Sequence, residues 1–207
     1  MKRNTIVSLA AGLASLIPVT VGAVEIQANT SAQQALLNTL LKGSYAFTAS
    51  RTCVQTPYSP GFDQTTRQLL TDGETVGFIE SGTLTFSGTG SVKGDNITVA
   101  VMEPAKAIAG SAPMQNGITS SCAGTYSVNP NRSYSATLTC TSQLGNGLSL
   151  AIGPAAYQGS VDVTQNMLTI SETGGNIQAV TVAIGGTPVQ SFDRVCTSSG
   201  TLIRTGK

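Results

Sequence analysis

Apolar and polar side chains alternate along most of this chain, in short runs separated by glycine, proline and asparagine. The first run, 45–53, places Tyr45, Phe47, Ala49 and Cys53 on one parity, with mostly Ser and Thr on the other. A period of two is the period of a β-strand with one buried face. With this run there are nine or ten such runs, and no helical pattern lies between them. They predict an all-β fold: a single antiparallel β-barrel, or a barrel-like sandwich, of about eight to ten strands.

No linker or internal repeat divides residues 43–207, so we expect them to form one barrel domain. Within it, Gly153-Pro154 is expected to turn the chain between two strands. One short helix is expected before the barrel, within 24–42. Ser31 is its predicted N-cap, which leaves 24–30 as a loose tail.

The first residues, 1–23, have the features of a secretory signal peptide. Lys2 and Arg3 precede an apolar stretch, 6–17, that is shorter than the roughly 20 residues needed to span a membrane. A proline and then small residues suited to signal peptidase follow, so we expect cleavage after Ala23. The alternative is an uncut membrane anchor. We favour cleavage, and therefore a secreted or periplasmic protein that is not inserted in a membrane.

Four cysteines in an exported chain predict two disulfides. Alternation on both sides of an Asn-Pro-Asn-Arg turn predicts a hairpin over 122–140. Folding this hairpin about residue 131 puts every apolar residue on one face and sets Cys122 opposite Cys140. Directly opposed positions on neighbouring strands lie within disulfide reach, so we predict the Cys122–Cys140 bond.

The remaining pair, Cys53 and Cys196, is then predicted to join the first and last strands. This bond favours the barrel over the sandwich, because the terminal strands of a barrel meet. A metal site is the alternative use of the four cysteines. It would lack both histidine and C-x-x-C spacing, so we expect no metal and no other cofactor.

The composition excludes several functional classes. Charged residues make up only 10% of the chain, against about a quarter of an average soluble domain, and the net charge is +1. Nucleic-acid binding needs clustered Lys and Arg, so no nucleic-acid partner is expected. The absence of histidine excludes Ser-His and Cys-His catalysis. A hydrolase built on two carboxylates stays open, with Asp72 and Glu74 as candidate acids.

The triplet Gly43-Ser44-Tyr45, placed after the predicted helix, resembles the opening of lipocalins and related calycin barrels. Those barrels carry G-x-W at this point, and an arginine late in the chain packs over the tryptophan. Tyr45 stands in the place of that tryptophan, and Arg204 corresponds to the late arginine. The resemblance implies a barrel closed at one end by the helix, with a cavity for a small apolar ligand.

Two charged residues share the parity of buried positions. Arg51 lies on the parity of Phe47, and Glu80 lies on the parity of Phe78; Arg194 raises the same question near the end of the chain. An unpaired buried charge is costly, so an inward charge needs a partner or water. Either Arg51 and Glu80 line a cavity and hold the polar end of a ligand, or each reaches solvent at a strand end or bulge.

From these observations we expect a non-enzymatic, exported, disulfide-stabilised β-barrel that binds a small apolar molecule. Its candidate ligand-binding residues are Tyr45, Phe47, Arg51, Phe78, Glu80 and Tyr126. The alternative is a structural or interaction module of the cell envelope or extracellular matrix, with the Ser- and Thr-rich strand faces as its contact surface.

Overall fold

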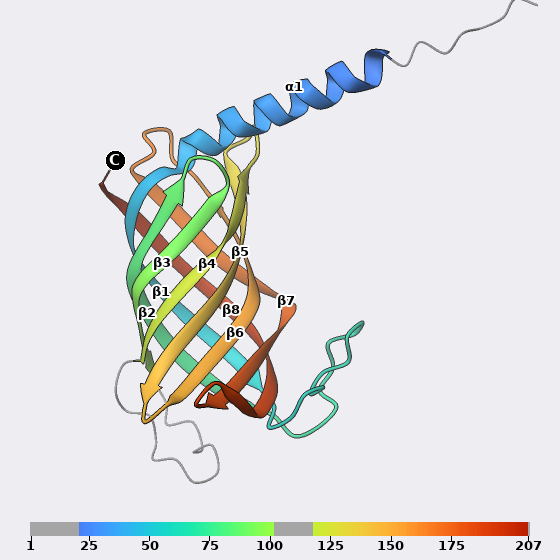
Figure 1. Cartoon of the computed structure of the whole chain (residues 1–207), viewed down its shortest axis with the longest axis vertical. Helices are drawn as coiled ribbons and strands as arrows, with labels where there is room; N and C mark the ends of the chain where they lie inside the picture. Colours follow the sequence, from blue (N-terminus) through green and yellow to red (C-terminus); the bar gives the residue numbers. More distant parts are fainter. Residues whose placement is uncertain (1–20, 102–117, 207) are drawn as a thin grey trace, which may run out of the picture.

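The computed structural model describes residues 21–101 and 118–206, in which eight strands form one closed antiparallel barrel (Figure 1). Each strand pairs with the next along the chain, and β8 pairs with β1 to close the ring. The strands are β1 (Lys42–Gln55), β2 (Glu74–Ser87), β3 (Ser91–Val101), β4 (Ile118–Val128), β5 (Ser133–Gly145), β6 (Leu148–Ser160), β7 (Met167–Ile184) and β8 (Thr187–Gly206). The predicted all-β antiparallel barrel is confirmed.

Several runs that the sequence separates are joined in the structure into single long strands. The predicted turn at Gly153-Pro154 is wrong, because both residues lie inside β6. The pairing of β6 with β7 shifts register after Gly153, and the pairing of β7 with β8 shifts after Thr173. Such irregularities let a strand pass a glycine or proline without ending. The described strands are therefore fewer and longer than the short runs of the sequence.

The alternation places apolar side chains inside the barrel and small polar side chains outside. In β1 the buried positions run from Gly43 through Cys53 on one parity, and most residues between them are exposed. Outside, hydroxyl groups pair across neighbouring strands, as between Ser44 and Thr85 at 3.1 Å. Ser and Thr therefore provide most of the solvated surface that charged residues cover in other proteins.

The helix α1 (Val21–Asn38) is longer than predicted. It begins before Ser31, the expected N-cap, and includes residues 24–30, which were expected to be a tail. Alanine and glutamine recur in this stretch and favour the helical state. One 3₁₀ turn, η1 (Thr39–Leu41), then leads into β1. In the described part of the chain, no helix has the length and apolarity needed to cross a membrane.

The C-terminal part of α1, together with η1, covers one end of the barrel, which we call the helix end (Figure 1). The Tyr126 hydroxyl donates to the carbonyl oxygen of Asn38 at 2.9 Å, and the backbone N–H of Val128 donates to Asn38 Oδ1 at 3.0 Å. Leu41 is fully buried beneath this contact. Most of the predicted signal peptide lies outside the described residues, so its cleavage stays a prediction.

Below the helix end, the barrel is filled by a cluster of aromatic rings, which we call the helix-end core. The ring of Phe86 lies 5.6 Å from Tyr45, 5.1 Å from Tyr126 and 6.4 Å from Tyr134, in each case edge to face. Edge-to-face contacts stabilise aromatic clusters beyond their buried area. All four of these rings are buried.

Both predicted disulfides are confirmed. Cys53 of β1 bonds to Cys196 of β8, and Cys122 of β4 bonds to Cys140 of β5; in each pair the Cα atoms lie 4.0 Å apart. Both pairs are directly opposed in register on neighbouring strands. Two disulfides are typical of proteins in an oxidising compartment outside the cytoplasm.

Candidate functional site

A cavity of about 140 Å³ lies inside the half of the barrel away from α1, and we call it the far-end cavity. All eight strands contribute to its wall. Most of the wall is apolar, and its polar side chains include Gln55, Ser120, Ser142 and the charged residues described below. An eight-stranded barrel is just wide enough either to be filled by side chains or to hold one small ligand. This barrel is filled at the helix end and hollow at the far end.

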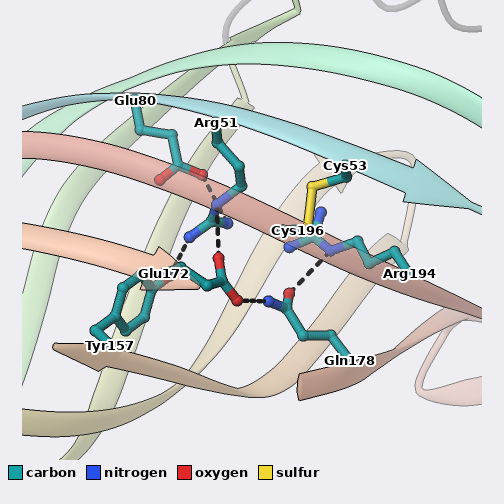
Figure 2. Close-up of a disulfide and its surroundings, with 8 residues drawn as sticks. All are labelled: Arg51, Cys53, Glu80, Tyr157, Glu172, Gln178, Arg194 and Cys196. Carbon is teal, nitrogen blue, oxygen red and sulfur yellow. Dashed lines mark hydrogen bonds and ion pairs between the residues drawn. A yellow bond between two sulfur atoms is a disulfide. The ribbon is translucent and has the colours of Figure 1, made fainter. Parts of the chain in front are cut away.

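Arg51 lines this cavity and lies at the centre of a buried polar cluster (Figure 2). Its Nη1 lies 2.8 Å from Glu80 Oε1, and its Nε lies 3.4 Å from Glu172 Oε2. Its Nη2 also donates a hydrogen bond to the hydroxyl of Tyr157. Two carboxylates and a phenol therefore surround a single guanidinium, and this satisfies the pairing that a buried charge requires.

Gln178 connects this cluster to Arg194 (Figure 2). Its Nε2 donates to Glu172 Oε1, and its Oε1 accepts a hydrogen bond from Arg194 Nε at 3.0 Å. The Arg194 guanidinium carbon lies 6.0 Å from the centre of the Phe78 ring. Gln178 is fully buried, so both ends of its amide are held in place.

Burial and neighbouring charges shift several pKa values in this cluster. Burial by itself would lower the pKa of Arg51, but Tyr157, Glu80 and Glu172 raise it above the usual range. Burial raises the pKa of Glu172, against the opposing effect of Arg51. Burial also raises the pKa of Tyr157 to about 12. For Arg194, burial and then the nearby Arg51 charge lower the pKa to about 10.

The structure shows that Arg51 and Glu80, the two charged residues predicted on buried strand faces, do lie inside the barrel. Arg51 is 6% exposed and Glu80 is 9% exposed, and both line the far-end cavity. The alternative in which each reaches solvent at a strand end or bulge is therefore wrong. The two charges tolerate burial because they pair with each other across β1 and β2.

The other predicted ligand-binding residues divide between the two halves of the barrel. Phe47 and Phe78 line the far-end cavity. Tyr45 and Tyr126 instead belong to the helix-end core, where the Tyr45 hydroxyl donates to the carbonyl oxygen of Gln165 at 3.1 Å. Strand parity indicates that a residue faces the barrel interior. It does not indicate whether that residue lies in the helix-end core or in the cavity wall.

Neither of the two acids considered for a hydrolase is part of the cavity wall, although Glu74 contacts Gln55, which is. Asp72 is exposed, and Glu74 Oε1 accepts a hydrogen bond from Gln55 Nε2 at 2.6 Å. Within residues 21–101 and 118–206, no group of three or more acidic or cysteine side chains is arranged to hold a metal ion.

Sequence reasoning missed Glu172, Gln178 and Tyr157 as members of the charged cluster. A signal was present, because Glu172 continues the parity of Leu168 and Ile170 in β7. The contact between Glu172 and Arg51 could not be found this way. It joins β1 to β7, which are not neighbours in the sheet, so it depends on the width of the barrel.

At the helix end, Arg204 packs over the ring of Tyr45, with its guanidinium carbon 5.5 Å from the ring centre. Its Nη2 also donates to the carbonyl oxygen of Lys42. The packing of Arg204 over Tyr45 is the arginine–aromatic contact that the resemblance to lipocalins implies. Comparison of the chain with known protein families, with curated proteins and with solved structures finds no match.

Proposed function

We propose that this protein is a non-enzymatic binding protein that holds one small apolar molecule in its far-end cavity. The observation that carries the proposal is the contrast between the two halves of the barrel. The helix end is filled by aromatic side chains, whereas the far end holds a cavity with a mainly apolar wall. Apolar cavities with a few placed polar groups are the usual form of small-molecule sites.

The volume of the cavity limits the size of the ligand. At about 140 Å³ it is close to the roughly 150 Å³ of an engineered apolar cavity that binds benzene or xenon. The proposed ligand is therefore about the size of one aromatic ring or a short alkyl chain. Leu150, Val180 and Phe192 supply the apolar contacts on one side, and Phe47 and Phe78 supply them on another.

The surroundings of the cavity support a role in binding outside the cytoplasm. Two disulfides tie neighbouring strands together, and the sequence predicts a cleaved signal peptide. The packing of Arg204 over Tyr45 supports a lipocalin-like barrel. A rigid, exported barrel suits a carrier or scavenger of small molecules.

Calorimetric titration with benzene tests the proposal, using a variant that fills the cavity. Ala155 lines the cavity, whereas its neighbour Ala156 is exposed on the outside of the same strand. We expect benzene to bind the wild-type protein and Ala156→Leu, and to lose measurable affinity for Ala155→Leu. Equal binding to the two variants, or no binding to the wild-type protein, would contradict the proposal.

One observation favours the alternative role as an interaction module. Met167 and Ile203 are directly opposed on β7 and β8 and are 50% and 61% exposed. Exposed apolar groups of this kind mark contact surfaces when they extend into a patch. Light scattering over a range of protein concentrations tests self-association. A mass that rises with concentration, and that falls in Ile203→Thr, would support this role.

A further inference from the structure

The barrel encloses two arginines whose surroundings differ. Arg51 is paired with Glu80 at 2.8 Å and faces Glu172 at 3.4 Å. Arg194 is 7% exposed, yet its contacts are neutral: the Gln178 side-chain oxygen and the face of the Phe78 ring. Among the described residues, no carboxylate oxygen lies within 4.0 Å of its guanidinium nitrogens.

The single hydrogen bond of Arg194 also fixes its orientation. Nε is used by Gln178, whose other end is held by Glu172. The terminal nitrogens, Nη1 and Nη2, have no hydrogen-bond partner among the described residues, and Arg194 is part of the cavity wall. A guanidinium held in this way presents its two terminal N–H groups as a fork, which matches the two oxygens of a carboxylate.

Glu80 and Glu172 balance the charges of the two arginines, but neither carboxylate touches Arg194, whose terminal N–H groups have no hydrogen-bond acceptor among the described residues. An anion that enters the cavity supplies this acceptor and a direct charge partner. We propose that the ligand of the far-end cavity is a small apolar anion whose carboxylate binds Arg194. This inference rests on the proposed function, because it assumes that the cavity is occupied. Arg51 does not take this role, since its three guanidinium nitrogens already face Glu80, Glu172 and the Tyr157 hydroxyl.

The cavity wall around Arg194 accounts for the apolar part of the ligand. Leu150 and Val180 pack together with Phe192 close by, and all three line the cavity with Arg194. The Phe78 ring, which also lines the cavity, lies with its centre 6.0 Å from the Arg194 guanidinium carbon. The chemical class is therefore an aromatic or short-chain monocarboxylate, for which benzoate is a suitable probe.

The test measures the affinity of three probes by calorimetric titration: benzoate, the neutral benzyl alcohol, and acetate, which has the charge without the ring. The variants are Arg194→Gln and, as a control, Arg67→Gln, which removes the same charge from an exposed loop. We expect wild type and Arg67→Gln to bind benzoate more tightly than the other two probes. We expect Arg194→Gln to lose about tenfold or more of its benzoate affinity and to keep its affinity for benzyl alcohol.

The outcomes separate this inference from the proposed function. If benzyl alcohol binds as tightly as benzoate, or if Arg194→Gln keeps its benzoate affinity, the anion site is refuted while the cavity function stands. If acetate binds as tightly as benzoate, a bare anion site replaces the proposed ligand class. If no probe binds the wild-type protein, both proposals fail. If Arg194→Gln does not fold, two other measurements test the anion site. The wild-type protein should bind benzoate more tightly than benzyl alcohol, and this preference should be weaker in Arg194→Lys.

Discussion

At the scale of single residues, the charges inside the barrel are distinguished by their partners. Arg51 holds together two carboxylates that would otherwise repel each other, one on β2 and one on β7. Arg194 has no such partner among the described residues, and its pKa is lowered to about 10, first by burial and then by Arg51. Arg51 is therefore expected to contribute to stability, and Arg194 to binding.

Replacing Arg51 tests the first of these roles. In Arg51→Gln, Glu80 and Glu172 lose the cation that they share and remain buried, so the free energy of unfolding is expected to fall by about 3 to 5 kcal/mol. Urea denaturation followed by circular dichroism measures this loss, with Arg67→Gln as the surface control. A loss below about 1 kcal/mol would mean that the cluster does not need its central cation.

A substitution at Gly43 tests the close contact between β1 and β8 at the helix end. Its φ is +125°, and an added Cβ would lie 2.6 Å from the carbonyl oxygen of Gly206 on β8. Gly145 also has a positive φ, of +88°, but an added Cβ there meets no atom within 4 Å. We expect Gly145→Ala to cost about 1 kcal/mol of unfolding free energy from backbone strain alone, and Gly43→Ala about 2 to 3 kcal/mol. Equal losses in denaturant melts would show that β1 and β8 separate easily at this point.

At the scale of elements, the connections between strands depend on a few side chains. The link between β6 and β7 is built around Asp162, whose Oδ1 accepts hydrogen bonds from the backbone N–H groups of Asn166 at 2.8 Å and Met167 at 3.0 Å. The Thr164 hydroxyl also donates to this carboxylate. Hydrogen bonds from Thr164 and then Met167 hold the pKa of Asp162 below its usual range.

This lowered pKa predicts an acid-sensitive turn. Because the folded pKa lies below the unfolded value, the stabilisation by Asp162 is present above the unfolded pKa, about 3.9, and is lost as the pH falls through the folded pKa. Asp162→Asn should therefore lower the thermal unfolding midpoint more at pH 6 than at about pH 2.5. Asp72→Asn, on an exposed loop, is the matched control. A deficit of the same size at both pH values would rule out this role for the carboxylate.

The two disulfides are expected to contribute different amounts to the free energy of unfolding. The Cys53–Cys196 bond closes a loop with a sequence separation of 143, and the Cys122–Cys140 bond one of 18. The chain-entropy model assigns about 5 kcal/mol to the longer loop and about 3 kcal/mol to the shorter. The double Cys→Ala variant of the first pair should therefore have the lower unfolding free energy in urea. The reverse order would mean that native contacts, rather than loop closure, set the contribution of each bond.

At the scale of the whole molecule, strand parity predicted the β-strands and the Cys122–Cys140 bond, because side-chain direction in a strand depends only on counting residues. The Cys53–Cys196 bond was predicted as the remaining pair, and it favoured the barrel over the sandwich. Parity put Arg51 and Glu80 on the buried side of their strands, but it left open whether each reaches solvent; the structure shows that both are buried. Parity did not predict that Gly153-Pro154 lies within a strand. A register shift in the β6–β7 pairing lets β6 continue through these two residues, where the sequence indicated a turn. The division of the barrel into a filled half and a hollow half depends on how side chains from all eight strands meet, and no local pattern contains that information.

The central claim is that the far end of the barrel is a binding cavity and the helix end is a packed core. Nuclear magnetic resonance of the protein with labelled Leu and Val methyl groups, titrated with benzene, tests it most directly. We expect saturable shifts of the Leu150 and Val180 methyl signals, which belong to the cavity wall. The Leu168 and Leu202 methyls, which are buried but do not belong to the cavity wall, should stay unshifted. Shifts confined to surface methyls such as Val189, or no shifts at saturating benzene, would contradict the account.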